Sequence, residues 1–445
     1  MFSFTKKTML SMLTAGAIAM TSQTASAANW LMLQGTEKPG SAPRAKLWGF
    51  IQTQYQKDFS DECIHSGSNN CGGASGYVSP KLVGPNLDSQ EAFNVNRARI
   101  GVRGTGFPLD SKVNYFILAE LGNNGITHGS DGKILSDASI TLNYIPGARI
   151  RAGLFKTPGF EEGLQAIHVF DYINFTSVGN QLMLERHPNE GDVNQGASQT
   201  PNADMNQYSR AVGAFRDVGI QIFDTFGNDK HEIAYAVMYG NGNGLNYSDN
   251  DDNKDIYAYF SSEWIFGGKG PRRQGLKIFA WHQDGKRTNI NDKTAEQDRT
   301  RSGLGVKYLK KPFRVTAEYL TGEGMIFMGQ HRPGNGAAST AGIFNNEKAD
   351  GYYLDFGFYI PGTNWEIDAR YDSYTRGENH PNTPLTDDGD STFDTITVGT
   401  QYHFNKKTRI NVEYADRDFK SDALVVNNNL KGVKGRFALQ LTHIF

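Results

Sequence analysis

The last eleven residues of the chain alternate strictly between two kinds of side chain and stop on an aromatic residue. The mainly apolar face carries Phe437, Leu439, Leu441, His443 and Phe445. The other face carries Arg436, Ala438, Gln440 and Thr442. A period of two is that of a β-strand, and a terminal strand must find a partner for each of its edges. We therefore expect this strand to close a transmembrane β-barrel by pairing with the first strand.

The beginning of the chain has the features of a secretory signal peptide. Lys6 and Lys7 precede an apolar run over 9–20, and the small residues Ala25, Ser26 and Ala27 follow it. The run is shorter than the roughly 20 apolar residues that a spanning helix needs. We expect a signal peptide over 1–27, a short periplasmic segment over 28–45 and a single barrel over 46–445. Both termini should lie in the periplasm of a Gram-negative bacterium, with the barrel integral to the outer membrane.

The composition fits strands that face lipid on one side and water on the other. The chain has 445 residues, with 50 Gly, 20 Tyr and 27 Phe. Its mean hydropathy of -0.52 is too low for a helical membrane protein but ordinary for a water-filled barrel. The formal net charge of -2 gives no general attraction to nucleic acid, so we expect no nucleic-acid partner.

Period-two alternation predicts an all-β, antiparallel transmembrane barrel of about sixteen strands. The expected strands are 46–57, 93–106, 111–122, 134–146, 147–157, 214–226, 231–240, 254–266, 275–286, 301–310, 312–322, 350–361, 364–376, 392–404, 407–418 and 434–445. Tight turns and long loops alternate between them, and one expected long loop covers 287–300. Sorting of turns and loops to opposite ends is typical of a membrane barrel, whereas a secreted sandwich has no reason for it.

Four segments resemble the phosphate-selective porin O and P family, and the similarity runs from Arg97 to Phe445. They are Arg97-Ala-Arg-Ile-Gly-Val-Arg-Gly104, Ala152-Gly-Leu-Phe-Lys-Thr-Pro-Gly-Phe-Glu161, Arg216-Asp-Val-Gly-Ile-Gln221 and Asn241-Gly-Asn-Gly244. The resemblance implies a sixteen-stranded barrel, usually a homotrimer, whose third long loop folds into the lumen. That loop corresponds here to about 158–213. The expected partners are outer-membrane lipid, the barrel assembly machinery and small anions such as phosphate.

Six basic residues are the candidates for an anion path along the lumen. They are Arg97, Arg99, Arg103, Lys112, Arg149 and Arg151. In this reading Asn96, Ala98, Ile100, Val102 and Gly104 face lipid. Guanidinium forks match phosphate and carboxylate oxygens, so anions should pass more easily than cations. The alternative is that these arginines pair with inward acids such as Glu120 and Asp137, which leaves a general or weakly cation-selective porin.

The expected third loop is rich in acids. Its candidates for the constriction are Glu161, Glu162, Asp171, Glu185 and Arg186, with further charges at Glu190, Asp192 and Arg210. A mixed wall is expected elsewhere, from Arg314, Glu318, Glu366, Asp368, Arg370 and Asp372. Lys156, just before the loop, reads best as an interfacial lysine whose side chain reaches water. The second interpretation is a charge that anchors the base of the loop.

Cys63 and Cys71 are the only cysteines, and seven residues separate them in the expected first outer loop. In an oxidising compartment this spacing favours a small disulfide over a metal site, since only His65 lies between them. The acidic run 249–255 lacks the central glycine of a tight calcium loop. No Gly-x-Ser-x-Gly motif is present, so we expect no enzyme, metal or cofactor. An adhesive surface barrel is a further alternative.

Overall fold

The computed structural model describes fifteen ranges or single residues of the chain. They are 29–33, 45–60, 91–105, 110–127, 134–185, 213–245, 249, 251–270, 272–289, 292–327, 343–344, 347–377, 390–422, 427 and 430–445, which include every barrel strand. The predicted signal peptide, Cys63, Cys71 and Arg186 lie outside the described residues, as do Glu190, Asp192 and Arg210.

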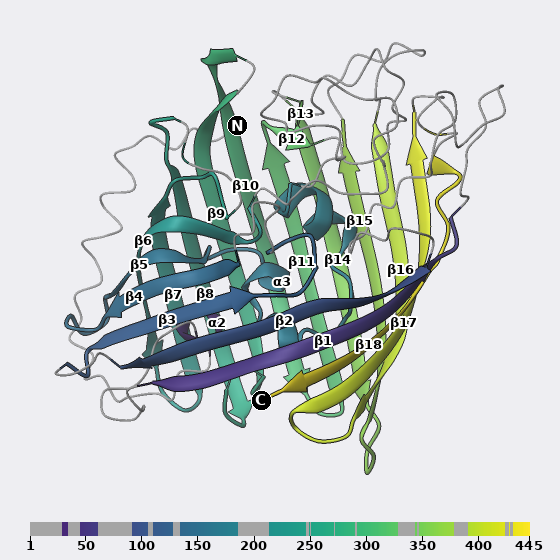
Figure 1. The fold of residues 1–445 in the computed structure, drawn as a ribbon, viewed down its shortest axis with the longest axis horizontal. Helices are drawn as coiled ribbons and strands as arrows, with labels where there is room; N and C mark the ends of the chain where they lie inside the picture. The colour runs from purple at the N-terminus through teal and green to yellow at the C-terminus, as the bar shows by residue number, and fades with distance from the viewer. Residues whose placement is uncertain are drawn as a thin grey trace.

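The chain forms a closed antiparallel barrel of sixteen strands (Figure 1). They are β1 (Lys46–Asp58), β2 (Glu91–Thr105), β3 (Val113–Glu120), β4 (Leu135–Leu142), β5 (Arg149–Lys156), β6 (Arg216–Gly227), β7 (His231–Gly240), β8 (Asp255–Gly267), β9 (Gln274–Asn289), β10 (Asp292–Lys310), β11 (Phe313–Glu323), β14 (Lys348–Tyr359), β15 (Trp365–Arg376), β16 (Ser391–His403), β17 (Thr408–Ser421) and β18 (Arg436–Ile444). Each pairs with its neighbours in sequence, and β18 closes the barrel on β1. The predicted barrel is therefore confirmed.

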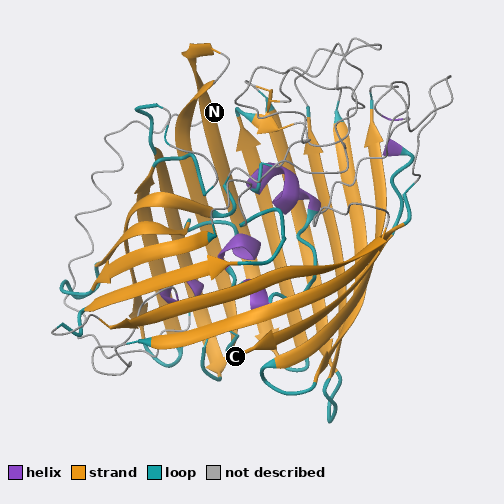
Figure 2. Ribbon diagram, in the orientation of Figure 1, coloured by secondary structure: helices purple, strands orange, loops and turns teal. Residues whose placement is uncertain are grey.

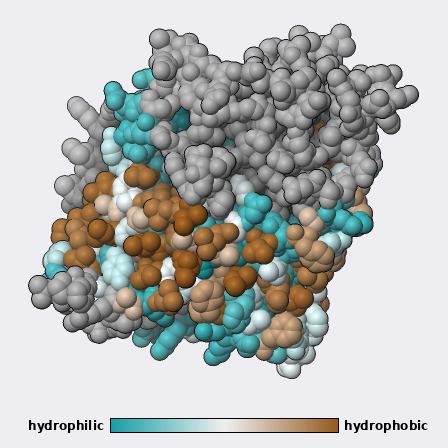
Figure 3. Space-filling view, viewed as in Figure 1, coloured by the Kyte–Doolittle hydropathy of each residue, from teal (hydrophilic) through white to brown (hydrophobic). Residues whose placement is uncertain are grey.

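Side chains alternate across the wall as strands in a membrane require. On β18, Gln440 and Thr442 are buried inside the barrel, whereas Leu441 is 41% exposed on the outside. Phe437 and Leu439 share the outer face with Leu441. Figure 3 shows hydrophobic residues gathered in a band across the described part of one face. Because a one-residue slip would turn the polar face toward lipid, this alternation fixes the register.

β2 departs from simple alternation at one residue. Gln52 lies opposite Arg97, but its neighbour Thr53 lies opposite Val95, so Asn96 is the extra residue of a β-bulge. The bulge turns the side chain of Asn96 away from lipid, and it is buried. The expectation that Asn96 faces lipid is therefore wrong, because a bulge places two consecutive side chains on one side of the wall.

β9 and β10 form a longer hairpin than the sequence predicts. Lys286 pairs with Asp298 and Arg287 with Gln297, within the range 287–300 that was expected to be a loop. The extension is polar on both faces, so it lacks the apolar alternation from which a strand is recognised. Its inward face adds charged side chains to the lumen.

Short helices lie inside the barrel (Figure 2). α3 (Glu161–Leu164), the 3-10 helix η1 (Ile167–Val169) and the π-helix η2 (Gly179–Met183) belong to the third long loop, hereafter loop 3 (157–215). α2 (Trp30–Leu33) comes from the N-terminal segment, and a small separate sheet joins β12 (Ile326–Phe327) to β13 (Ile343–Phe344). In the described part of the chain no helix has the length and apolar character to cross a membrane.

Loop 3 provides much of the buried apolar core. Phe160, Leu164, Phe170, Val178 and Leu182 are buried, and they cluster with inward aromatic side chains of the wall. The loop carries the apolar side chains that the polar lumen lacks, so its burial holds it inside the barrel. The predicted inward fold of the third loop is confirmed over 157–185.

Candidate channel constriction

Loop 3 leaves the wall at the end of β5 and reaches toward the other side of the lumen. The carboxylate of Glu161 accepts hydrogen bonds from Lys277 on β9, at 2.6 Å, and from Lys307 on β10, at 3.3 Å. All three side chains are buried or nearly so. Because a buried carboxylate is stable only when it is well paired, these two lysines fix the position of α3.

Glu185 ends the described first part of loop 3 and binds three arginines. Its carboxylate pairs with Arg287 on β9 at 3.0 Å, with Arg301 on β10 at 3.4 Å, and with Arg299 on β10. The backbone of Glu185 has φ of 51°, a conformation that costs energy outside glycine. Burial alone would raise the pKa of this carboxyl, but the three guanidinium groups outweigh it and hold the pKa at about 2.

Glu162 and Asp171 attach the middle of loop 3 to the wall. Asp171 pairs with Arg272 at 2.6 Å and with Arg314 of β11 at 3.0 Å, so its pKa is low although burial opposes this. Glu162 accepts a hydrogen bond from the Thr176 hydroxyl at 2.7 Å and lies 3.4 Å from Arg370 of β15. For Glu162 burial prevails, and its pKa rises to about 8.

The four described constriction-loop acids, Glu161, Glu162, Asp171 and Glu185, are thus buried partners of basic residues on the wall. They fasten loop 3 rather than present unpaired carboxylates to a solute. The fifth candidate, Arg186, lies outside the described residues.

The basic residues of β2 lie against the base of loop 3. Arg99 pairs with Glu120 at 2.6 Å, as the alternative interpretation expected, and Arg97 donates to the amide oxygen of Gln52 at 3.1 Å. Arg103 is half-buried. A cavity of about 20 Å³ is lined by Arg97, Arg99, Lys156 and Arg216, together with Phe215 and other loop residues. Basic side chains from three strands therefore meet at this cavity.

The two arginines of β5 have different surroundings. Arg149 pairs with Asp224 of β6. The guanidinium of Arg151 lies 4.3 Å from the centre of the Phe223 ring and donates to the carbonyl oxygen of Leu31 at 3.3 Å. Arg151 is only 1% exposed, so in this structure α2 and the wall cover it.

Lys112 does not line the lumen, so this expectation is wrong. It lies in the turn before β3, it is exposed, and its ammonium is 5.6 Å from the centre of the Tyr144 ring. Tyr144 is itself exposed on the outer side, following the outward residues Ile140 and Leu142. β3 begins at Val113, so Lys112 precedes the strand and the alternation of the strand does not turn its side chain into the lumen.

Lys156 also differs from its favoured interpretation. Its side chain is buried, and its ammonium donates to the carbonyl oxygens of Leu164, at 3.5 Å, and of Gln165. The chain leaves the wall at this point, so the alternation that would turn Lys156 toward lipid no longer applies. Its contacts fit the second interpretation, a charge at the base of loop 3.

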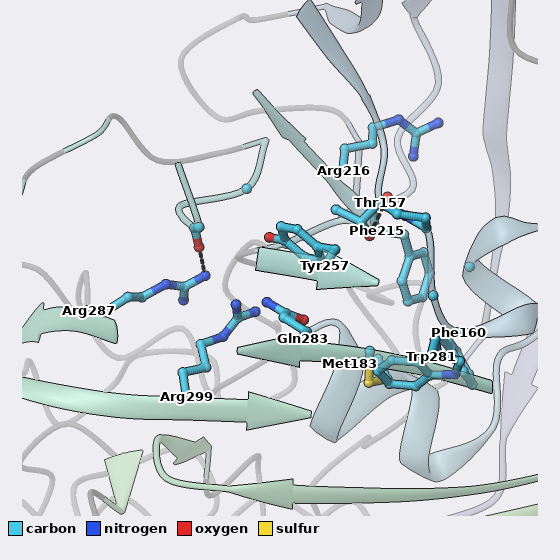
Figure 4. Close-up of a pocket in the computed structure, with 16 residues that line it drawn as sticks. Thr157, Phe160, Met183, Phe215, Arg216, Tyr257, Trp281, Gln283, Arg287 and Arg299 are labelled. Carbon is cyan, nitrogen blue, oxygen red and sulfur yellow. Dashed lines mark hydrogen bonds between the residues drawn. The ribbon is translucent and has the colours of Figure 1, made fainter. Parts of the chain in front are cut away.

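The sequence analysis missed the basic residues of β9 and β10. Lys277, Arg287, Arg299, Arg301 and Lys307 all point into the barrel and contact loop 3 or α2. Figure 4 shows Arg287 and Arg299 approaching Gln283 from one side of a cavity of about 30 Å³, with Phe160, Phe215 and Trp281 on the other. The alternation of Gln297, Arg299 and Arg301 is the available signal, but Gln297 and Arg299 fall in the range 287–300, which the sequence pattern predicts to be a loop.

The residues predicted to form a mixed wall are buried on the inner side of the barrel, as strand alternation predicts. Arg314 on β11 pairs with Glu366, at 2.9 Å, and with Asp368 on β15. Glu318 accepts hydrogen bonds from Trp281 and Tyr353, each at 2.7 Å, and also from the backbone of Glu161. This wall is largely internally paired, so it adds little net charge to the lumen.

Comparison with known proteins gives both a family and a fold. A model of the Gram-negative porin family matches residues 14–422. Among solved structures, an anion-selective porin from Comamonas acidovorans superposes with a TM-score of 0.51 at 15% identity, over 90% of this chain and 99% of that one. A loop L8 deletion mutant of OmpT, an outer membrane protein of Vibrio cholerae, gives 0.50 at 10% identity, over 90% and 99%. At such identities these structures show the fold alone. The search of curated proteins found no match.

Proposed function

The chain belongs to the Gram-negative porin family, and we propose that its outer-membrane channel prefers small anions, phosphate and other oxyanions among them. The observation that carries this proposal is the cavity at the base of loop 3. Three guanidinium groups line it, those of Arg97, Arg99 and Arg216. The Lys156 ammonium also lines the cavity, and the acidic residue in its lining is Glu162, whose pKa burial raises to about 8. Basic side chains therefore outnumber acidic ones in this lining, and fixed charge in a narrow pore concentrates counter-ions.

The resemblance to phosphate-selective porins also favours an anion preference, but it is more specific than the family match. The matched model is that of Gram-negative porins in general, so phosphate selectivity stays within this proposal. Arginine is suited to the task, because its planar donors bind two oxygens of one oxyanion.

Titration of phosphate and sulfate against chloride current tests the proposal. Purified protein is inserted in a planar bilayer, and the current is followed as each oxyanion is added. We expect a reduction of the chloride current that is weaker in Arg97→Gln. The control is Lys420→Gln, which changes an exposed lysine paired with Asp418 and should match the wild type. Equal currents with and without phosphate, in wild type and Arg97→Gln alike, would contradict oxyanion binding.

A general porin of weak selectivity is the second candidate, and the ion pairs favour it. Arg99 pairs with Glu120, Arg149 with Asp224 and Arg216 with Asp137. If these pairs cancel the arginine charge seen by a solute, phosphate will not block the chloride current.

The family is one of channels, so no catalytic step is proposed. Among the described residues, no cluster of three or more His, Cys, Asp or Glu side chains could hold a metal ion.

A homotrimer remains a proposal that rests on the resemblance. Periplasmic termini remain a proposal that rests on the alternation of tight turns and long loops, and the barrel assembly machinery remains a proposed partner. The test of the trimer is chemical crosslinking of the protein in outer-membrane preparations. Crosslinked species of up to three copies, and none larger, would support the trimer. A monomer at every crosslinker concentration would exclude it.

A further inference from the structure

The N-terminal segment Asn29–Leu33 is packed inside the barrel. Asn29, Trp30, Leu31 and Met32 are 2 to 4% exposed, which differs from the periplasmic placement that the sequence suggests for 28–45. Figure 1 shows α2 behind β2 and β3, toward the end of the barrel where the short turns lie. We propose that this segment is a second constriction of the channel, separate from loop 3, which narrows the lumen and covers part of its basic wall.

Contacts from three strands hold the segment against one side of the lumen. The amide of Asn29 donates to the hydroxyl of Ser261 on β8 at 3.3 Å. Arg151 on β5 donates to the carbonyl oxygen of Leu31 at 3.3 Å. The ammonium of Lys307 on β10 lies 5.7 Å from the centre of the Trp30 ring. β5, β8 and β10 lie within six consecutive strands of the wall, so a segment that contacts all three crosses this side of the lumen and does not follow one strand.

Local chemistry explains why these residues form a compact turn. The side-chain oxygen of Asn29 accepts a hydrogen bond from the backbone of Leu31 at 3.1 Å, as asparagine does at the start of a helical turn. The backbone of Met32 also donates to the carbonyl of Asn29, at 3.0 Å. Both bonds satisfy polar groups that would otherwise be buried without partners.

Apolar burial holds the turn in place. Trp30, Leu31 and Met32 belong to the same buried cluster as Phe223, Ala234, Ala236, Tyr259 and Phe279 of the wall. Removal of apolar side chains from water favours this placement of the turn. Beside the turn, Asn29, Trp30, Glu263, Arg273, Lys277 and Lys307 line a cavity of about 20 Å³. That volume has room for about one or two waters.

The position of the segment links pore size to charge. It covers Arg151 and contacts Lys307, two basic side chains that a passing anion could otherwise reach. Loosening the segment should therefore widen the lumen and also expose positive charge. The effect on charge rests on the proposed anion preference, whereas the effect on pore size does not.

The test is single-channel recording of a variant that loosens the segment without shortening the chain, Trp30→Gly with Leu31→Ser and Met32→Gly. We expect conductance to rise roughly twofold, because a narrow segment dominates the resistance of a pore. The reversal potential should move toward that of a more anion-selective channel.

The matched control is Leu430→Ser with Val433→Gly, which removes buried apolar side chains away from the segment. An unchanged conductance in the triple variant would overturn the second constriction even in an anion-selective channel. A cation-selective wild type would overturn the proposed function while leaving the conductance result valid.

A thiol probe tests the placement in case the triple variant fails to fold. Met32→Cys is introduced together with Cys63→Ser and Cys71→Ser, and Lys420→Cys in the same background reports an exposed site. A bulky charged methanethiosulfonate should react with Met32→Cys far more slowly than with Lys420→Cys, and the reaction should lower the current. Equal reaction rates with no change of current would place the segment outside the lumen and overturn the proposal.

Discussion

At the scale of single residues, the acids of loop 3 show how burial decides the role of a charge. Sequence spacing marked Glu161, Glu162, Asp171 and Glu185 as constriction residues. The structure pairs each with a basic side chain of the wall. The basic residue that pairs with each acid is far from it in sequence. The sequence alone does not specify such contacts.

Glu185 is the residue whose loss should loosen loop 3 most. Glu185→Gln removes the charge that three arginines share, and leaves those arginines facing one another without it. We expect larger fluctuations of the open-channel current at pH 7, measured by single-channel recording. The control is Glu323→Gln, whose carboxylate is exposed and pairs weakly with Lys348. Current noise identical to wild type in Glu185→Gln would show that the loop does not need this clamp.

The ion pairs between Glu185 and the three arginines should persist in mildly acidic solution. The pKa of Glu185 is about 2 in the folded protein, below the ordinary value of 4.5, so the ionised form is favoured by folding. Its stabilisation is present above about pH 4.5 and is lost as pH falls toward 2. Current noise from this site should therefore stay unchanged between pH 7 and pH 4.5.

Glu162 should respond to pH in the opposite range. Burial raises its pKa to about 8, with Arg370 opposing this and Asp355 and Asp372 adding to it. Because the raised pKa favours the protonated form, the stabilisation is full below about 4.5 and is lost as pH rises through 8. We expect loop 3 to loosen between pH 7 and pH 9 in the wild type, read as current noise, and not in Glu162→Gln. A pH response that persists in Glu162→Gln would assign it to another group.

At the scale of elements, the strands were predictable and their irregularities were not. Alternating side chains identify a strand because lipid and water lie on opposite sides of the wall. The bulge at Asn96 and the extension of β9 and β10 break that rule, since the first adds a residue and the second extends a hairpin that is polar on both faces. The extension holds Arg287 and Arg299, two of the three arginines that bind Glu185, and both fall in the range that the sequence pattern predicts to be a loop.

The attachment of α3 to β9 can be measured as a coupling between two side chains. In a double-mutant cycle of Glu161→Gln and Lys277→Gln, we expect a coupling of about 1–3 kcal/mol in the free energy of unfolding, because both groups are buried. Denaturant titration in detergent micelles gives the four values. The matched control is Glu91→Gln with Lys57→Gln, an exposed pair at a similar distance of 2.8 Å, which should show little coupling. Equal coupling in the two cycles would mean that burial does not strengthen the α3 contact.

At the scale of the whole molecule, the barrel wall and its contents have different origins. The wall follows from alternation, and its closure of β18 on β1 was visible in the last eleven residues. The contents, loop 3 and α2, are held by contacts between distant residues, and they determine how wide and how charged the path is. The fold was thus predictable from sequence, whereas the lining of the path was predictable only for residues such as Arg97 and Arg99 that follow strand alternation.

The measurement that bears most directly on this account is the reversal potential of the wild-type channel in a planar bilayer under a KCl gradient. The mainly basic lining of the cavity beside loop 3 predicts a reversal potential of the sign given by chloride passing more readily than potassium. A reversal potential of the opposite sign, with potassium passing more readily, would contradict an arginine-lined anion path and would identify the acids of the lumen as the groups that a solute meets.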